Sequence, residues 1–139
     1  MKYLFQLIVL VLLLVSCSKE KVTSTVAAMD VPDTTAQLKY SGNFANGPYG
    51  TTSGTVKIYA KETVYTLVLD SFMVNSGPDL HVYLSKEVQP LNFLDLGVLR
   101  SNSGVQVYNI NGMPDFKDFK YALIHCQQFN HLFGSAILK

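Results

Sequence analysis

The chain has 139 residues, with 11 lysines and arginines against 10 aspartates and glutamates, and 48% of its residues are hydrophobic. Its charge is close to balanced, which excludes nucleic-acid binding through a basic face. The length allows one ordinary hydrophobic core, so a single domain is expected.

The N-terminus has the layout of a bacterial lipoprotein signal peptide. Lys2 precedes the apolar run of residues 4–15, which ends abruptly at Ser16-Cys17. The run is shorter than the roughly 20 residues of a membrane-spanning helix, so we expect cleavage. Residues 14–17 resemble the lipobox, in which the cysteine is acylated, for example with palmitate, and becomes the new N-terminus. The alternative is an ordinary secretory signal with an incidental cysteine.

These features predict three segments. Residues 1–16 form the signal peptide, residues 17–36 comprise the lipidated Cys17 and a flexible tether, and residues 37–139 form the domain. The tether is polar, small and rich in threonine, without apolar periodicity. The expected location is the bacterial cell envelope, where the lipid on Cys17 anchors the protein to a membrane that faces the periplasm or the exterior.

Short alternating apolar and polar runs fill the rest of the chain, separated by turns rich in Gly, Pro, Asn and Asp. This pattern predicts an all-β fold, an antiparallel β-sandwich or barrel of about eight short strands. The predicted strands are Leu38–Phe44, Thr55–Tyr59, Val64–Phe72, Leu80–Ser85, Gly97–Arg100, Val105–Ile110, Tyr121–Cys126 and Phe133–Leu138.

Four stretches occur together in one order: SGTVKIY at 53–59, SGPDLHVYLS at 76–85, LGVL followed by GVQVY at 96–108, and YALIHCQQF to FGSA at 121–136. Together they resemble the DM-thirteen domain, the electron-transfer DM family associated with Skeletor-type proteins. The resemblance implies an extracellular β-domain with a redox-active cysteine near its C-terminus, and the matching residue is Cys126. Where the family pattern has an aromatic residue before this cysteine, the chain has His125.

Cys126 has three interpretations from the residues themselves. If Cys17 carries lipid, Cys126 is the remaining thiol in an oxidising compartment. It can be a small buried core residue, because free cysteine is among the most buried residue types. It can also be a thiol available for redox chemistry at a strand end, beside the loop 127–132 and His131.

The third interpretation is a copper site formed by His81, Cys126 and His131, because a blue-copper centre needs two histidines and one cysteine. No methionine follows His131 in the usual axial position. Three functions therefore stay open: electron transfer or thiol redox through Cys126, a cupredoxin-like copper carrier, and a noncatalytic binding or adhesion module with a buried Cys126. Paired catalytic carboxylates, a nucleophile elbow and a phosphate-binding glycine loop are absent from the sequence, which gives no support for hydrolase or transferase chemistry.

Overall fold

The computed structural model describes residues 27–139, which contain nine β-strands and no helix. The strands form a single sheet in the order β1-β7-β4-β3-β2-β9-β8-β5-β6. The signal peptide and Cys17 lie outside the described residues. The strands are β1 (Ala28–Met29), β2 (Gln37–Asn46), β3 (Thr52–Lys61), β4 (Val64–Val74), β5 (Leu80–Ser85), β6 (Phe93–Val98), β7 (Ser103–Ile110), β8 (Tyr121–Cys126) and β9 (His131–Ile137).

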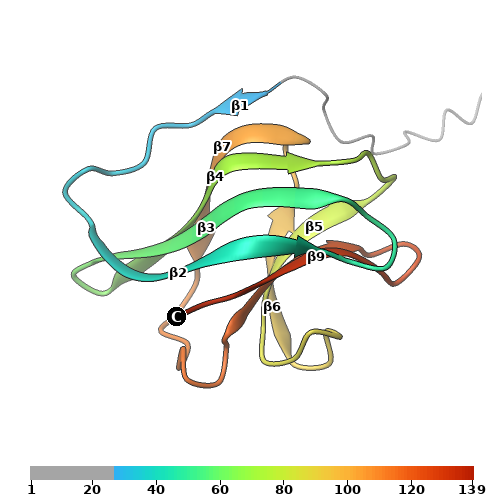
Figure 1. Ribbon diagram of the computed structural model, residues 1–139. Coiled ribbons are helices and arrows are strands. Elements are labelled where there is room, and N and C mark those ends of the chain that lie inside the picture. Colours follow the sequence, from blue (N-terminus) through green and yellow to red (C-terminus); the bar gives the residue numbers. More distant parts are fainter. Residues whose placement is uncertain (1–26) are drawn as a thin grey trace, which may run out of the picture.

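The all-β prediction is confirmed, and the sheet curls into a half-barrel (Figure 1). It is mixed rather than purely antiparallel, because β1 pairs with β7 in parallel while every other pair is antiparallel among residues 27–139. Strand β2 joins the two halves of the curl: its residues 37–43 pair with β3, and its residues 44–46 pair with β9. Gly42 permits this crossing, since a Cβ there would lie 2.2 Å from the carbonyl oxygen of Ile137.

The hydrophobic core lies inside the curl. Alternation with period two points Leu80, Val82 and Leu84 of β5 inward, together with Ile124 and Cys126 of β8. Side chains from β3, β4 and β7 complete the main core cluster; they include Val56, Ile58, Leu67, Leu69, Tyr108 and Ile110.

Strands β5 and β8 are also covered on their outer face. All six residues of β5 are buried, and a second, smaller core cluster contains Tyr83, Leu123 and Leu132. A strand buried on both faces is unusual for an antiparallel sheet, whose outer face commonly meets water. The pair β5–β8 is therefore the most enclosed part of the described chain and carries most of the candidate site residues.

The segment that precedes β2 lies against the sheet. Strand β1 pairs with β7 at Ala28↔Gly104 and Met29↔Val105, and a Cβ on Gly104 would lie 2.0 Å from the carbonyl oxygen of Ala28. Asp30 then accepts a hydrogen bond from the backbone N–H of Val107 at 2.8 Å. Within the segment predicted to be a tether, residues 28–30 thus pair with strand β7.

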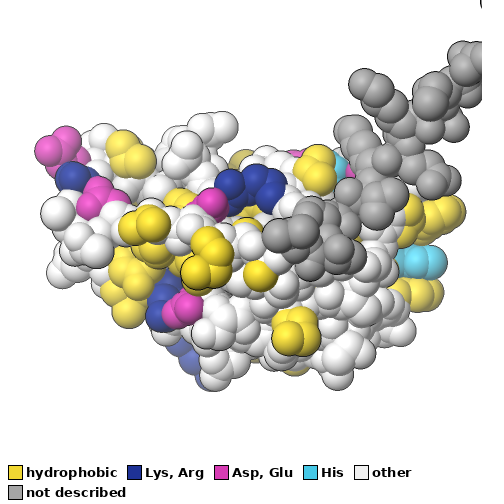
Figure 2. Space-filling view, turned by 90° about the horizontal axis from the view of Figure 1, so that it is seen from above, with side chains coloured by type: hydrophobic (Ala, Val, Ile, Leu, Met, Phe, Trp, Pro, Cys, Tyr) yellow, Lys and Arg dark blue, Asp and Glu magenta, His cyan; other side chains and the backbone are white. Residues whose placement is uncertain are grey.

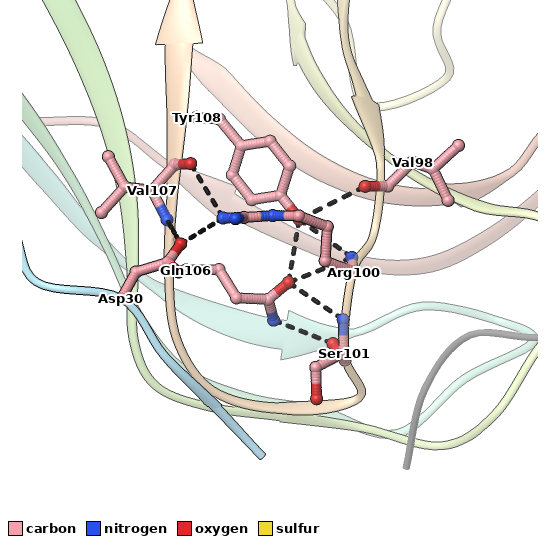
Figure 3. Close-up of polar contacts among 7 residues, drawn as sticks. All are labelled: Asp30, Val98, Arg100, Ser101, Gln106, Val107 and Tyr108. Carbon is pink, nitrogen blue, oxygen red and sulfur yellow. Dashed lines mark hydrogen bonds and ion pairs between the residues drawn. The ribbon is translucent and has the colours of Figure 1, made fainter. Parts of the chain in front are cut away.

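Arg100 completes this attachment (Figure 3). Its guanidinium contacts the carboxylate of Asp30, donates to the carbonyl oxygen of Val107 at 2.9 Å and lies over the ring of Tyr108. We call the contacts of Asp30 with Arg100 and Val107 the N-terminal latch. Within residues 27–139, no helix is long and apolar enough to cross a membrane.

Candidate functional site

Cys126 ends strand β8, at the start of the turn that leads to β9. Its register partners are Leu80 on β5 and His131 on β9. The side chain belongs to the main core cluster and is only 1% exposed. A free thiol in this position is closed to reagents that must touch the sulfur, although the turn beside it, residues 127–130, is exposed.

His131 lies on the surface side of the same hairpin. Its ring stacks on that of Tyr49, with centroids 3.6 Å apart and planes inclined by 2°, and the ring of Phe129 lies 6.0 Å away. Tyr49 and Phe129 are both exposed. Figure 2 shows hydrophobic side chains on both sides of a histidine at the right-hand edge of the molecule. The contacts of His131 are therefore with aromatic rings.

A different group of side chains occupies the outer face of β5 and β8. His81 and Tyr83 alternate with the inward residues of β5, and His125 is the register partner of His81 on β8. The ring of Tyr83 stacks on those of Phe93, at 4.3 Å, and His125, at 5.3 Å. Phe93 comes from β6, so the three rings cross three neighbouring strands. We call Phe93, Tyr83 and His125 the aromatic column.

Two carboxylates flank this face. The Nδ1 atom of His81 lies 2.9 Å from an oxygen of Asp95, and its Nε2 atom lies 3.4 Å from an oxygen of Asp79. A carboxylate on Nδ1 fixes the orientation of an imidazole ring and leaves the other nitrogen free to interact. The ring of His81 is buried, and its Nε2 has no hydrogen-bond partner among the described residues.

Burial shifts the pKa values of two members of the aromatic column, His125 and Tyr83. Desolvation lowers the pKa of His125, and the nearby His131 and His81 lower it further. Neither ring nitrogen of His125 has a hydrogen-bond partner among the described residues, so the ring is neutral at physiological pH. Desolvation raises the pKa of Tyr83, Asp95 and Asp79 add to the rise, and a hydrogen bond with Gln127 opposes it.

The structure does not bring the three predicted copper ligands together. Cys126 and its register partner Leu80 belong to the core inside the curl, whereas His81, next to Leu80, points to the outer face. Within residues 27–139 no group of three or more His, Cys, Asp or Glu side chains is arranged to hold a metal ion. The copper hypothesis requires all three side chains to lie close together, and the structure does not show this arrangement.

Sequence reasoning missed the aromatic column and the carboxylates beside it. The alternation in residues 80–85 and 121–126 does separate Tyr83 from Leu84 and His125 from Cys126, but it does not say which face is buried inside the sheet. Phe93 and Asp95, however, fall outside the strands predicted from the sequence, and the register between strands cannot be read from the alternation within one strand.

A model of the protein family described as electron transfer DM13 matches residues 43–138. Comparisons with curated proteins and with solved structures found no match. The matched region begins within β2 and ends just after β9, so it includes Cys126 and the whole aromatic column.

Proposed function

Because the chain belongs to the electron transfer DM13 family, we propose that it is an electron-transfer domain held at the outside of a bacterial membrane by a lipid on Cys17. The family match over residues 43–138 carries the proposal. The signal-peptide pattern of residues 1–17 supports the anchor, since a signal peptide that ends at a cysteine is typical of lipoproteins.

Within this function, Cys126 is the proposed redox residue. It is the free cysteine of the described chain and it lies next to an exposed turn. Its burial restricts the chemistry: peroxides and disulfides must touch the sulfur, so they can react only when the turn 127–130 opens. The opening of a short exposed turn requires less free energy than unfolding of the whole domain.

The test is the reactivity of Cys126 in the native full-length protein. We expect a thiol reagent to modify it slowly in the folded state and rapidly in denaturant. Mild oxidation should be reversed by dithiothreitol, as followed by mass spectrometry. Cys126→Ser should remove both signals, whereas His81→Ala and His131→Ala should keep reversible oxidation, because thiol chemistry does not require a second ligand.

One observation favours a second function. An exposure of 1% within an apolar cluster also fits a purely structural cysteine. If native Cys126 is neither modified nor reversibly oxidised, thiol redox is refuted and a binding or adhesion module with a buried cysteine becomes the better proposal.

A further inference from the structure

One end of the sheet carries both the start of β1 and four of the connections between strands. Ala28 pairs with Gly104 at the start of β7, and Phe72, near the end of β4, pairs with the same glycine. Antiparallel pairing continues this end through the start of β3, the end of β2, the start of β9 and the end of β8 (right in Figure 1). We call this end the tether end; its connections are 47–51, 75–79, 99–102 and 127–130.

The two ends of the sheet differ in charge. The connections of the tether end contain two charged residues, and both have partners: Asp79 lies beside His81, and Arg100 contacts Asp30. Removal of a charged side chain from water is costly, so the tether end is the better suited of the two to apolar surroundings. The three connections between β3 and β8 at the opposite end contain seven charged residues: Glu62, Lys86, Glu87, Asp115, Lys117, Asp118 and Lys120.

Exposed aromatic side chains project from the tether end. Tyr49 and Phe129 are each 54% exposed. They come from different turns, but His131 joins them, since its ring stacks on Tyr49 and lies 6.0 Å from the ring of Phe129. Tyrosine is enriched where membranes meet water, because its ring is apolar and its hydroxyl is polar. Leu91 and Met113 at the opposite end are exposed as well, but they lie in the charged connections.

The lipid anchor is attached close to the same end. If Cys17 carries the lipid, ten residues, 18–27, separate it from β1, and ten residues span at most about 36 Å. The N-terminal latch at Asp30 fixes β1 to β7, so the tether end stays near the bilayer. A surface held at such a short distance meets the membrane at a high effective concentration, and a weak apolar contact is then sufficient for docking.

We propose that the tether end docks on the lipid bilayer that holds the Cys17 anchor, with Tyr49 and Phe129 at the level of the lipid headgroups. The inference rests on the proposed anchor but not on any redox chemistry. It deepens the proposed function, because the turn 127–130 beside Cys126 then faces the membrane. The charged opposite end faces water.

The experiment compares how close the two ends lie to the lipid. The full-length lipidated protein is transferred from detergent to vesicles of phosphatidylcholine and phosphatidylglycerol. A fluorophore is attached to Gln128→Cys at the tether end or to Met113→Cys at the opposite end. Both positions are exposed, whereas Cys126 is 1% exposed, so labelling of the native protein is selective. Lipids with a spin label on the headgroup then quench a fluorophore that lies near the bilayer surface.

We expect the label on Gln128→Cys to be quenched severalfold more strongly than the label on Met113→Cys. Tyr49→Ser combined with Phe129→Ser should lower the quenching at position 128 to the level at position 113, without release of the protein from the vesicles. Leu91→Ser is the matched control, because Leu91 is 80% exposed at the opposite end, and it should leave the quenching unchanged. Equal quenching of the two labels, or unchanged quenching in the double variant, would overturn the proposal.

Sedimentation with the vesicles separates this inference from the proposed function. Protein that sediments through its lipid but shows no quenching at the tether end refutes docking and leaves the anchor intact. Protein that carries no lipid on Cys17 and does not sediment refutes the anchor and, with it, the inference. If the emission of the label on Gln128→Cys responds to protein concentration instead of lipid, the surface binds a second copy of the chain, which also overturns the proposal. The redox test of Cys126 is independent of these outcomes.

Discussion

The N-terminal latch gives a quantitative test of how the lipid-proximal segment is held. In Asp30→Asn the side chain can still accept the hydrogen bond from Val107, but the charged contact with Arg100 is lost. A hydrogen bond to a charged group contributes about 1.5–3 kcal/mol when buried. The side chains of Asp30 and Arg100 are 31% and 48% exposed, so solvent screening reduces this contribution to about 1 kcal/mol.

The loss should be local, because β1 has only two residues and pairs only with β7 among the described strands. The assay is amide hydrogen exchange by NMR. The N–H of residue 30, which donates to the carbonyl oxygen of Val105 at 3.0 Å, should exchange about fivefold faster in Asp30→Asn. The amides of Leu67 and Leu69 in the core should keep their protection. Equal exchange at residue 30 in both proteins would refute the stabilising role of the carboxylate.

The latch should also depend on pH. The hydrogen bond from the Val107 backbone and the contact with Arg100 lower the pKa of Asp30 below its ordinary 3.8. Since the folded-state pKa is depressed, the carboxylate stabilises β1 fully above pH 3.8, and this stabilisation is lost as the pH falls through the lower folded value. Asp30→Asn should lack this dependence between the two pKa values.

Two further predictions concern the anchor and the metal. Cys17→Ala should move the protein from the membrane fraction to uncleaved or soluble forms, because no segment after residue 17 has about 20 consecutive apolar residues; unchanged processing and attachment would contradict this. The purified protein should stay colourless with Cu(II), because His81 and Cys126 face opposite sides of the sheet; an intense copper-thiolate colour that disappears in His131→Ala would restore the copper hypothesis.

The strands that sequence reasoning placed best are those with clear alternation between turn signals. Residues 80–85 and 121–126 were predicted with the same bounds that β5 and β8 have in the structure. Turn-forming residues lie next to each of these strands. The Gly77-Pro78-Asp79 turn, for example, comes directly before β5. Local chemistry decides such boundaries, so a local pattern is sufficient to predict them.

Strands β1 and β6 could not be placed in the same way. Strand β1 has two residues, too few for any periodicity, and its position depends on Arg100, 70 residues away from Asp30. Strand β6 was predicted at residues 97–100 and lies at 93–98. Gly97 in this strand has a φ of 118° and lies where the register of the pairing with β5 shifts, which is typical of a bulge. The sequence had placed this glycine at the start of a strand, whereas it lies near the end of β6.

For the candidate site too, one part could be predicted from the local sequence pattern and another part could not. Alternation within β8 correctly groups Cys126 with Ile124 and separates it from His125, but it does not say which face is the inside of the curl. That face follows from the register between strands, which pairs Cys126 with Leu80 and His125 with His81. The sequence alone therefore left open whether the thiol of Cys126 is buried or available. In the structure, the pairing of β5 with β8 places Cys126 in the core, where it is buried.

The burial of Cys126 has a consequence for how an electron-transfer domain of this kind can work. Thiol exchange and reaction with peroxide require contact with sulfur, so their rates are limited by opening of the turn 127–130. Electron transfer requires only proximity, because an electron tunnels through packed side chains without displacing them. A redox group on the outer face of β5 and β8 can thus exchange electrons while the fold stays closed.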